Sequence, residues 1–492
     1  MSSMNKWFCL PILAALLVAC GGDDDPYGRN GVDIADTVAI KISPVSANAP
    51  GLSVVVDVDL ADGEAGTPLD DLAYGQVAIF GLTPGTLELT VRGVVPEGAG
   101  PEGKYEDIFT TDSIETTGGN RYEIFVAGSY PDIDYWVTET PLEYAEADTQ
   151  ARLTVVNAST TMPSMDIHLT AVDAPIDTAS LIATLGANAS DNSIRVDEGE
   201  YQMKVTAAGS STVIYTSPVL SFAPNMDLSL VAIDNAWIKD GLTDKPPIAF
   251  SRSGASGSAA LMFSVDTGSD LRAVNAWPAG GSLDIHLKQD MLVEPFETDI
   301  QPGEVTPYQT VEGGTYGIQI EPVGVERNFN LINGVAWTMV VTEPDPESEE
   351  ASAPIPLFVS ENAREIAAYS RVRIIHASGS AETVDIYITE PNADFSDENA
   401  DGDPLYTPLG TGLALRTASG YISVAEGSYD ITFTRTVPEG ETAPDLPDIV
   451  YGPIEVTFTK GEIYTLVLRD QADLTTVTHQ WLDGAPEVVP AP

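Results

Sequence analysis

A set of short phrases recurs along this 492-residue chain at a nearly constant spacing. Three of its marker glycines, Gly199, Gly314 and Gly427, each lie two residues before a tyrosine. A fourth, Gly85, belongs to a fainter first copy, and the successive spacings are 114, 115 and 113 residues. A period of this length is that of a whole domain and exceeds that of a propeller blade or a helical repeat. The chain therefore consists of four copies of one domain.

Each copy reads as a series of short β-strands. In Met165-Asp166-Ile167-His168-Leu169 the apolar residues alternate with polar ones, so they share one face of a strand. No stretch shows sustained helical periodicity. The expected fold class is all-β, with four tandem immunoglobulin-like or transthyretin-like β-sandwich domains. The expected boundaries are 34–140 for a divergent first sandwich, then 148–240, 258–345 and 368–485, with a linker at 239–258.

Several repeated polar and aromatic positions have simple structural interpretations. His168 and His286 occupy the polar face of the same strand in two copies, which favours a solvated strand face over a metal site. The tyrosine that follows each marker glycine is expected to pack locally. Trp277 lies in a turn and is expected to fold over the end of its sandwich, with stacking on a sugar ring or a partner as the alternative.

The N-terminus carries a targeting signal. Lys6 precedes a short apolar run, which is too short to cross a bilayer as a folded helix, and Leu17-Val18-Ala19-Cys20 follows. This pattern resembles the bacterial lipoprotein signal, in which cleavage precedes a cysteine that is then acylated, and the alternative is an ordinary cleaved secretion signal. We therefore expect a signal peptide at 1–19, lipidation at Cys20 and an acidic tether at 20–33. Gly21, where an inner-membrane retention signal would have Asp, favours the outer membrane; the side on which the domains lie, periplasm or cell surface, stays open.

Charge and cysteine content exclude some classes of function. The formal net charge is −52, so the surface repels nucleic acid and anionic lipid headgroups. The two cysteines, Cys9 and Cys20, both precede the repeats, which therefore contain no disulfide and no cysteine-based metal site. No nucleophile elbow, zinc-protease, phosphate-loop or dinucleotide pattern occurs, and the chain is expected not to be an enzyme and to require no cofactor.

One loop of the fourth copy resembles half of a calcium-binding loop. Asp397, Asn399 and Asp401 stand at alternate positions before a glycine, and Asp403 follows it. Position twelve is Pro408 instead of a bidentate glutamate, so a β-domain calcium site would need a further ligand such as Asp394. A hydrated acidic loop is the favoured interpretation, and a calcium site that uses these ligands is the alternative.

The repeats also resemble a known family. The opening Arg-x-x-Val-Asn/His-Ala-Ser pattern, the Val-Asp-Ile-Tyr strand and the Gly-x-Tyr phrase are similar to the bacterial domain of unknown function 4397 family, best at Arg152–Tyr201 and Arg373–Tyr429. The third copy has Trp277 where serine is expected, and the first copy lacks the arginine and has Ser43 at the Asn/His position. The resemblance implies a small β-sandwich module of secreted or envelope proteins, and it implies no activity and no catalytic residues.

These observations lead to a functional expectation. The chain is expected to be a cell-envelope lipoprotein with a non-catalytic binding, adhesion or structural role, built as an acidic β rod and tethered to the outer membrane through Cys20. Its expected partners are the membrane, through the lipid, and an envelope protein or a glycan, but not nucleic acid. The alternatives are a calcium-dependent carbohydrate-binding module and a carboxylate-based hydrolase of the envelope.

Overall fold

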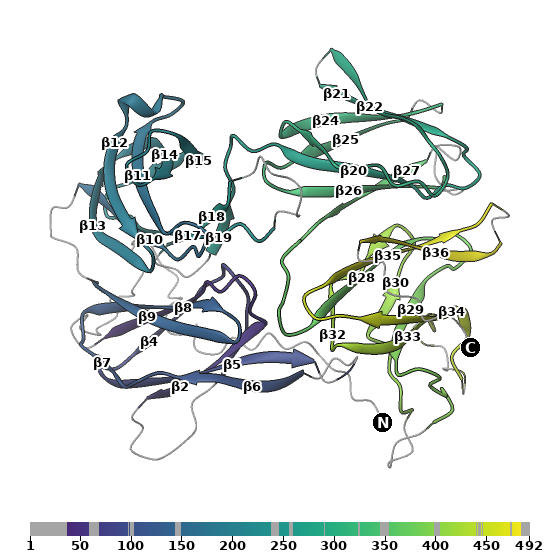
Figure 1. Ribbon diagram of the computed structural model, residues 1–492, viewed down its shortest axis with the longest axis horizontal. Helices are drawn as coiled ribbons and strands as arrows, with labels where there is room; N and C mark the ends of the chain where they lie inside the picture. Colours follow the sequence, from purple (N-terminus) through teal and green to yellow (C-terminus); the bar gives the residue numbers. More distant parts are fainter. Residues whose placement is uncertain are drawn as a thin grey trace.

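The computed structural model describes residues 37–58, 68–96, 98, 103–142, 149–237, 246–254, 259–289, 291–322, 325–344, 354–397, 404–438, 440, 444, 446–472 and 475–483. Within these ranges the chain is all-β, apart from one 3-10 turn at Ile176–Thr178, and it forms four two-sheet sandwiches (Figure 1). The expected fold class is confirmed.

The first sandwich contains strands β1 to β9. One sheet has the order β4-β1-β8-β9, and the other has the order β3-β2-β5-β6 with β7 also on β5. The strands are β1 (Val38–Pro44), β2 (Gly51–Val58), β3 (Pro68–Leu72), β4 (Ala78–Leu82), β5 (Gly85–Pro96), β6 (Gly103–Thr110), β7 (Ile114–Thr116), β8 (Asn120–Ser129) and β9 (Asp132–Pro141).

The second sandwich contains strands β10 to β19. Its sheets have the orders β13-β10-β17-β18-β19 and β12-β11-β14-β15, with β16 on β14. The strands are β10 (Gln150–Asn157), β11 (Ser164–Ala171), β12 (Ser180–Gly186), β13 (Ala189–Asp197), β14 (Gly199–Ala207), β15 (Val213–Thr216), β16 (Leu220–Phe222), β17 (Asp227–Asp234), β18 (Ile248–Gly254) and β19 (Ala259–Met262).

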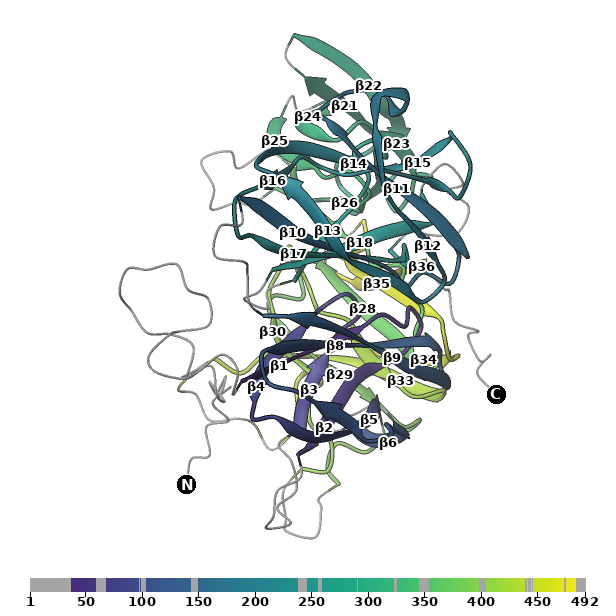
Figure 2. The same ribbon diagram turned by 90° about the vertical axis from the view of Figure 1, so that its left-hand side faces the viewer.

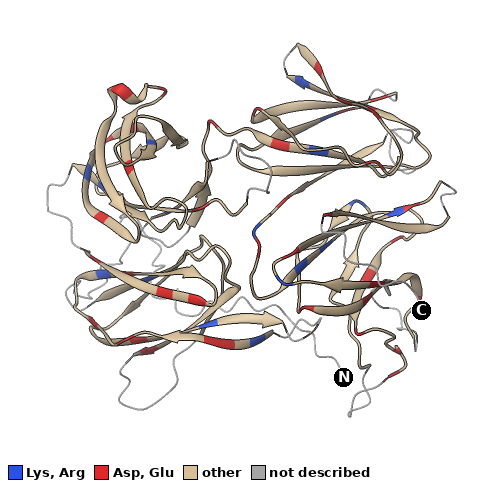
Figure 3. Cartoon of the chain, in the orientation of Figure 1, with Lys and Arg blue, Asp and Glu red and all other residues tan. Residues whose placement is uncertain are grey.

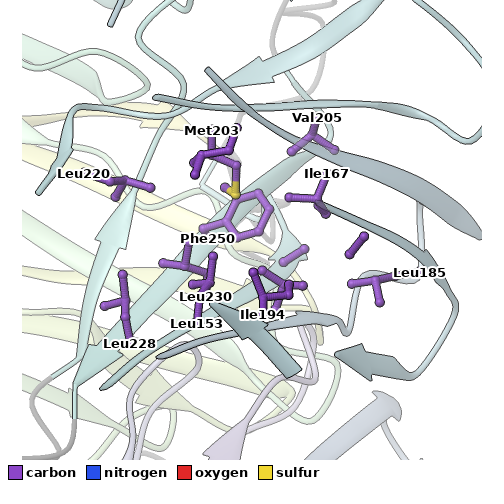
Figure 4. Packing of buried hydrophobic residues seen from close by; sticks show 14 of the residues in the cluster. Leu153, Ile167, Leu185, Ile194, Met203, Val205, Leu220, Leu228, Leu230 and Phe250 are labelled. Atoms are coloured by element: carbon purple, nitrogen blue, oxygen red, sulfur yellow. The ribbon is translucent and has the colours of Figure 1, made fainter. Parts of the chain in front are cut away.

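The second sandwich extends beyond the expected boundary at 240. Strand β18 lies in the stretch that we expected to be a linker, yet it pairs with β17 over seven residues. Its Ile248 and Phe250 are fully buried, and Phe250 packs against Tyr215 in the sandwich core (Figure 4). A short strand that ends in Ser-Arg-Ser-Gly becomes part of the sheet because two of its apolar side chains complete that core.

The third and fourth sandwiches repeat the plan. The third has the sheets β23-β20-β26-β27 and β22-β21-β24-β25, and the fourth has β31-β28-β35-β36, with β32 on β28, and β30-β29-β33-β34. Because β27 pairs with β26, the third sandwich reaches Ser360 instead of 345. The strands are β20 (Ser269–Asn275), β21 (Leu283–Gln289), β22 (Leu292–Ile300), β23 (Gln309–Val311), β24 (Gly314–Glu321), β25 (Val325–Leu331), β26 (Ala336–Thr342), β27 (Ile355–Ser360), β28 (Ser370–Ala377), β29 (Val384–Thr389), β30 (Gly410–Leu413), β31 (Thr417–Ala418), β32 (Ile422–Val424), β33 (Gly427–Arg435), β34 (Ile449–Phe458), β35 (Ile463–Asp470) and β36 (Val477–Asp483).

The first strand of each sandwich is buried on both of its faces. It pairs in parallel with a strand near the end of its own repeat: β1 with β8, β10 with β17, β20 with β26 and β28 with β35. Every residue of β1, β20 and β28 is buried. Alternate side chains of a strand point to opposite faces, so a second layer must cover the face that the sandwich's own core does not use.

That second layer is the neighbouring sandwich. One apolar cluster joins the first and second sandwiches, with Phe125 packed among Val156 and Val231, and another joins the third and fourth, with Val274 and Val340 facing Ile375 and Val467. Figures 1 and 2 show the resulting two pairs, and the sheet of β8 and β9 lies against that of β10 and β17. The expected rod is therefore wrong, because the apolar outer face of each first sheet is buried by pairing instead of being solvated.

The two pairs also touch each other. Ile366 and Tyr369, in the segment between the third and fourth sandwiches, form a buried cluster with Val95 of the first sandwich. The Ala367 amide donates to the Asn48 carbonyl at 2.9 Å, and the Ala425 amide donates to the Gly98 carbonyl at 3.1 Å. We call residues 361–369 the closing segment, since it connects the second pair to the first sandwich.

Candidate functional site

The repeated polar positions of the family pattern meet at the interfaces within the two sandwich pairs. The parallel registers place one polar pair at the same point of every sandwich, on the face turned away from the core. These pairs are Lys41 opposite Glu123, Thr154 opposite Ser229, Arg272 opposite Thr338 and Arg373 opposite Thr465. Two residues further along, the same face carries the apolar residues of the interface clusters, so each interface brings equivalent surfaces together as an isologous dimer does.

In the first pair, Asp227 joins the two sandwiches. Its carboxylate accepts from Arg121 of the first sandwich and from Arg152 of the second, each at 2.7 Å, and all three side chains are buried. Burial alone would raise the pKa of Asp227, but the two guanidiniums outweigh burial and hold this pKa below its usual range. Arg152 also donates to the Pro141 carbonyl, at the end of the first sandwich.

A second buried ion pair lies beside this bridge. Lys41 Nζ and Glu123 Oε1 are 2.5 Å apart, and both side chains are almost fully buried. The Ser229 hydroxyl of the second sandwich donates to Glu123 at 3.4 Å, so the pair also spans the interface. Burial lowers the pKa of Lys41, and the nearby Glu123 carboxylate opposes that effect.

The second pair uses Glu361 in the same way. This residue of the closing segment accepts from Arg272 of the third sandwich at 3.3 Å and from Arg373 of the fourth. Arg272 also reaches Asp483 of the fourth sandwich at 2.6 Å. Burial alone would raise the pKa of Glu361, but Arg373 and Arg272 outweigh it and lower the pKa. The arginines therefore join the two sandwiches through shared carboxylates, as in the first pair.

The Asn/His position of the family pattern fixes the turn that follows the first strand. The side-chain amide of Asn157 donates through Nδ2 to the Met162 carbonyl at 2.9 Å. Its Oδ1 accepts from the backbone amide of Ser159 at 3.2 Å. His376 plays the same part: its Nε2 lies against the Glu382 carbonyl, and its Nδ1 accepts from the Ser378 amide. This imidazole is therefore neutral, and burial lowers its pKa. Residues at this position hydrogen-bond to backbone groups of the turn, and both ring nitrogens of His376 are occupied by these contacts.

The same turn is capped by a carboxylate at the end of the parallel strand. Asp234 accepts from the Thr160 and Thr161 amides at 2.9 and 3.1 Å, and Asp470 accepts from the Gly379 and Ser380 amides at 2.9 and 3.2 Å. In the third sandwich the corresponding carboxylate is Glu343, which reaches across to Gly379 of the fourth sandwich. Burial, and then the Asp470 charge, raise the pKa of Glu343.

The aromatic and histidine positions behave as the sequence predicts. The Tyr201 and Tyr429 rings lie 3.2 Å from where a Cβ on Gly199 or Gly427 would be, which accounts for the Gly-x-Tyr phrase in the second and fourth copies. Trp277 packs against the core of the third sandwich and covers Gly280. His168 is only partly buried and lies 3.5 Å from the Thr206 hydroxyl.

The structure describes two of the predicted calcium ligands, Asp394 and Asp397. Asn399, Asp401 and Asp403 lie outside the described residues. Asp394 accepts from the amide and hydroxyl of Ser396 at 2.9 and 2.7 Å, which lowers the pKa of Asp394, and the Asp397 amide donates to the Asp394 carbonyl. Among the residues that the structure describes, no group of three His, Cys, Asp or Glu side chains is arranged to hold a metal. The calcium site stays a prediction, and chelation should change protease cleavage near Asp397 where calcium is bound.

The predicted lipidation site also lies beyond what the structure describes, since Cys20 falls within residues 1–36. In the described part of the chain, no helix has the length and apolarity needed to cross a membrane.

Sequence reasoning missed the interface residues. The sequence analysis does not single out Arg121, Asp227 or Glu361, although each side chain is almost fully buried. The available signal was the position of charged residues within strands that are otherwise apolar on both faces, as in Arg152-Leu153-Thr154-Val155-Val156. Such strands are typical of sheets covered on both sides.

Comparison with known proteins gives a family but no function. No curated protein matches the chain. Among solved structures, the Bacillus anthracis TIE protein is 10% identical, with 86% of this chain and 69% of that chain covered and a TM-score of 0.14. The Porphyromonas gingivalis tip fimbrial protein Mfa3 is 12% identical, with 66% and 99% covered and a TM-score of 0.13. These scores support no inference about this chain.

The family match follows the sandwich pairs. The family described as "Domain of unknown function (DUF4397)" matches residues 38–168 and 269–387, just over half of the chain. Each matched stretch begins with the first strand of one sandwich, β1 or β20, and ends within the second strand of its partner, β11 or β29. Each stretch therefore contains the first strands of both members of a pair. The chain belongs to this family of domains of unknown function.

Proposed function

We propose that this chain is a non-catalytic lipoprotein of the cell envelope, which holds two paired β-sandwich units at the outer membrane through an acylated Cys20. The membrane part of the proposal is supported by the sequence: Lys6, the apolar run and Leu17-Val18-Ala19-Cys20 stand in the order that a lipoprotein signal requires. Several acyl chains on one cysteine anchor a protein firmly, whereas a single chain would not.

The non-catalytic part is supported by the use that the chain makes of its repeated polar residues. Arg272 and Arg373 are committed to buried ion pairs between sandwiches, and Asn157 and His376 are committed to turn backbones. An active site needs such groups to face a substrate. Here they fix how one sandwich sits on the next, which is the requirement of a scaffold or a binding protein.

The acidic surface fits the same proposal. Asp and Glu residues occur on all four sandwiches (Figure 3), and the formal net charge is −52. Such a surface disfavours polyanionic ligands and favours solubility in an extracytoplasmic, salty medium. An envelope protein or a glycan therefore remains the proposed class of partner.

Metabolic labelling with a fatty-acid analogue, followed by membrane fractionation, tests the anchor. The wild-type chain should incorporate the label and sediment with outer membranes, while Cys20→Ala should lose both properties and stay folded. A Cys20→Ala chain that still sediments with outer membranes would contradict the proposal. Protease added to intact cells would then show which face of the membrane the sandwiches occupy.

A further inference from the structure

The hairpin of β21 and β22 presents an apolar tip. The two strands register Gln289 with Leu292, and three consecutive apolar side chains are exposed at this end of the hairpin. Met291 is 98% exposed, Leu292 is 61% exposed and Val293 is 44% exposed. We call these three residues the apolar tip. Single exposed apolar residues are common on soluble proteins, but a consecutive group at the end of a hairpin is typical of an interaction site.

The position of the hairpin makes the tip accessible. In Figures 1 and 2 the β21–β22 hairpin projects from the third sandwich beyond the rest of the molecule, at the end opposite to the strands of the first sandwich. Its base is rigid, because β21 also pairs with β24 and places Leu283 and Ile285 in the core of the third sandwich. A rigid base with an exposed apolar end loses little conformational entropy on binding.

Side chains, and not an open sheet edge, form this surface. Strand β22 is an edge strand, but Pro295 interrupts its hydrogen bonding, the register shifts next to His286, and Asp299 adopts a φ of 58°. These features blunt an edge against addition of a further strand. The tip therefore fits insertion into a pocket better than extension of a sheet.

The charged residues near the apolar tip indicate what kind of partner surface is complementary to it. Lys288, the cation nearest the tip in the sequence, pairs with Glu326 at 2.9 Å, and Glu294, which directly follows the tip, is exposed. A negative surface around an apolar tip is repelled by anionic lipid and by a second copy of this chain, whose formal charge is −52. A pocket with an apolar floor and a rim of Lys or Arg is complementary to it.

We propose that the apolar tip inserts into an apolar, basic-rimmed pocket of a partner protein. This inference goes beyond the envelope role and does not depend on acylation of Cys20. Met291 is suited to the centre of such a contact, because its unbranched thioether side chain adapts to irregular pockets.

The chain offers a clean way to test the contact. Its two cysteines precede the described residues, so in a Cys9→Ala, Cys20→Ala background a new cysteine is the only thiol. In the full chain with Met291→Cys, a benzophenone crosslinker is attached to the new cysteine. The labelled chain is mixed with the cell-envelope fraction and irradiated. The matched control carries Leu181→Cys, since Leu181 is an exposed apolar residue of the second sandwich. The captured protein is then purified and titrated against the unlabelled chain.

The proposal expects one protein to be captured from position 291 and not from position 181. Leu292→Asp and Glu294→Lys should each raise the Kd for that protein about 10-fold, high salt should weaken binding, and Leu181→Asp should leave it unchanged. Unaltered melting temperatures would show that these variants are folded. The proposal is overturned if the crosslinker captures no protein, captures the same protein equally from both positions, or captures a second copy of this chain. It is also overturned if the chain pellets with neutral phosphatidylcholine vesicles, or if the Glu294→Lys chain binds the captured protein as tightly as the wild type does.

Discussion

At the scale of single residues, the molecule depends on a few buried charges that the repeat places between sandwiches. Asp227 serves two arginines, and Glu361 serves two others. Buried ion pairs add little net stability compared with apolar packing, but removing one member leaves the others charged and unpaired in a dry environment. These ion pairs select one relative placement of the two sandwiches, since a shifted or rotated sandwich would leave the buried charges unpaired.

Asp227→Ala should therefore destabilise the first sandwich pair by about 3–5 kcal/mol, because Arg121 and Arg152 lose their shared carboxylate. The midpoint of the corresponding urea transition measures this loss. Asp107→Ala removes the carboxylate of an exposed pair with Arg92 and should change stability by less than about 1 kcal/mol. Equal effects of the two substitutions would show that Asp227 does not hold the interface.

The contribution of Glu343 to folding stability should depend on pH in the opposite sense from the contributions of Asp227 and Glu361. The pKa values of Asp227 and Glu361 are lowered in the folded state, so their stabilising effect is present at neutral pH and is lost as the pH falls through those values. The pKa of Glu343 is raised, so its charge destabilises the folded state at neutral pH and ceases to do so once the pH is below its unfolded pKa.

Glu343→Gln should accordingly raise the melting temperature at pH 7 and have no effect near pH 4, since Gln still accepts from the Gly379 amide without a charge. Melting curves measured across this range test the prediction. Glu455→Gln, at an exposed position of the fourth sandwich, serves as the control and should leave the melting temperature unchanged throughout. A Glu343→Gln chain that is less stable at pH 7 would contradict the assignment.

At the scale of strands and turns, glycine and tyrosine together define how β14 and β33 begin. Gly199 has a φ of 153°, and the Tyr201 ring lies 3.2 Å from the place of a Cβ, so both backbone and space favour glycine. Tyr201 in turn meets Phe222 edge to face, on the strand that pairs with this one. The phrase is therefore a packing device of the sandwich.

Gly199→Ala should lower the melting temperature, because the new methyl group strains the backbone and displaces the Tyr201 ring. Gly186→Ala is the matched control in the same sandwich, since a Cβ there meets nothing within 4 Å and the φ needs no glycine. Alanine at 186 should leave stability unchanged or raise it by about 0.5–1 kcal/mol. Equal losses at both positions would show that the Tyr201 contact is unimportant.

Much of this element-level structure follows from the sequence, and the limits have physical causes. The alternation in Met165–Leu169 and the 114-residue period predict the strands and the four sandwiches, because core faces impose a period of two. The same rule assigns Arg152 and Lys41 to solvent, where they would lie in a lone sandwich. Their burial depends on a second sandwich, which local periodicity does not encode. Strand β18 was missed because its pairing partner and its core contacts, not its own composition, make it a strand.

At the scale of the whole molecule, four sandwiches form two pairs that the closing segment connects. Arg364 of that segment is partly buried and has no carboxylate partner among the described contacts: it donates to the Ala47 carbonyl at 2.7 Å and to the Ala49 carbonyl, and it stacks on Tyr74 at 5.0 Å. Burial, and then the charge of Arg371, lower the pKa of Arg364 to about 10. A cation held by backbone carbonyls and an aromatic ring links the second pair to the first sandwich.

Arg364→Ala should loosen this link without unfolding either pair. Amide hydrogen exchange in residues 361–369, including the Ala367 amide bonded to Asn48, should become at least about 10-fold faster, because local opening costs less free energy. Arg435→Ala removes an exposed arginine that pairs with Glu382 and Asp448, and it should leave exchange in the closing segment unchanged. Unchanged exchange in Arg364→Ala would show that apolar contacts alone hold the segment.

Small-angle X-ray scattering from a Cys20→Ala chain that lacks residues 1–19 tests directly whether the sandwiches are paired and closed on each other. Sandwiches paired and closed in this way should give a radius of gyration of about 25 Å, near that of a compact chain of this length, and a single-peaked distance distribution. Four sandwiches arranged end to end would instead give about 40 Å with an extended tail. That second result would contradict the buried interfaces within the pairs and between them.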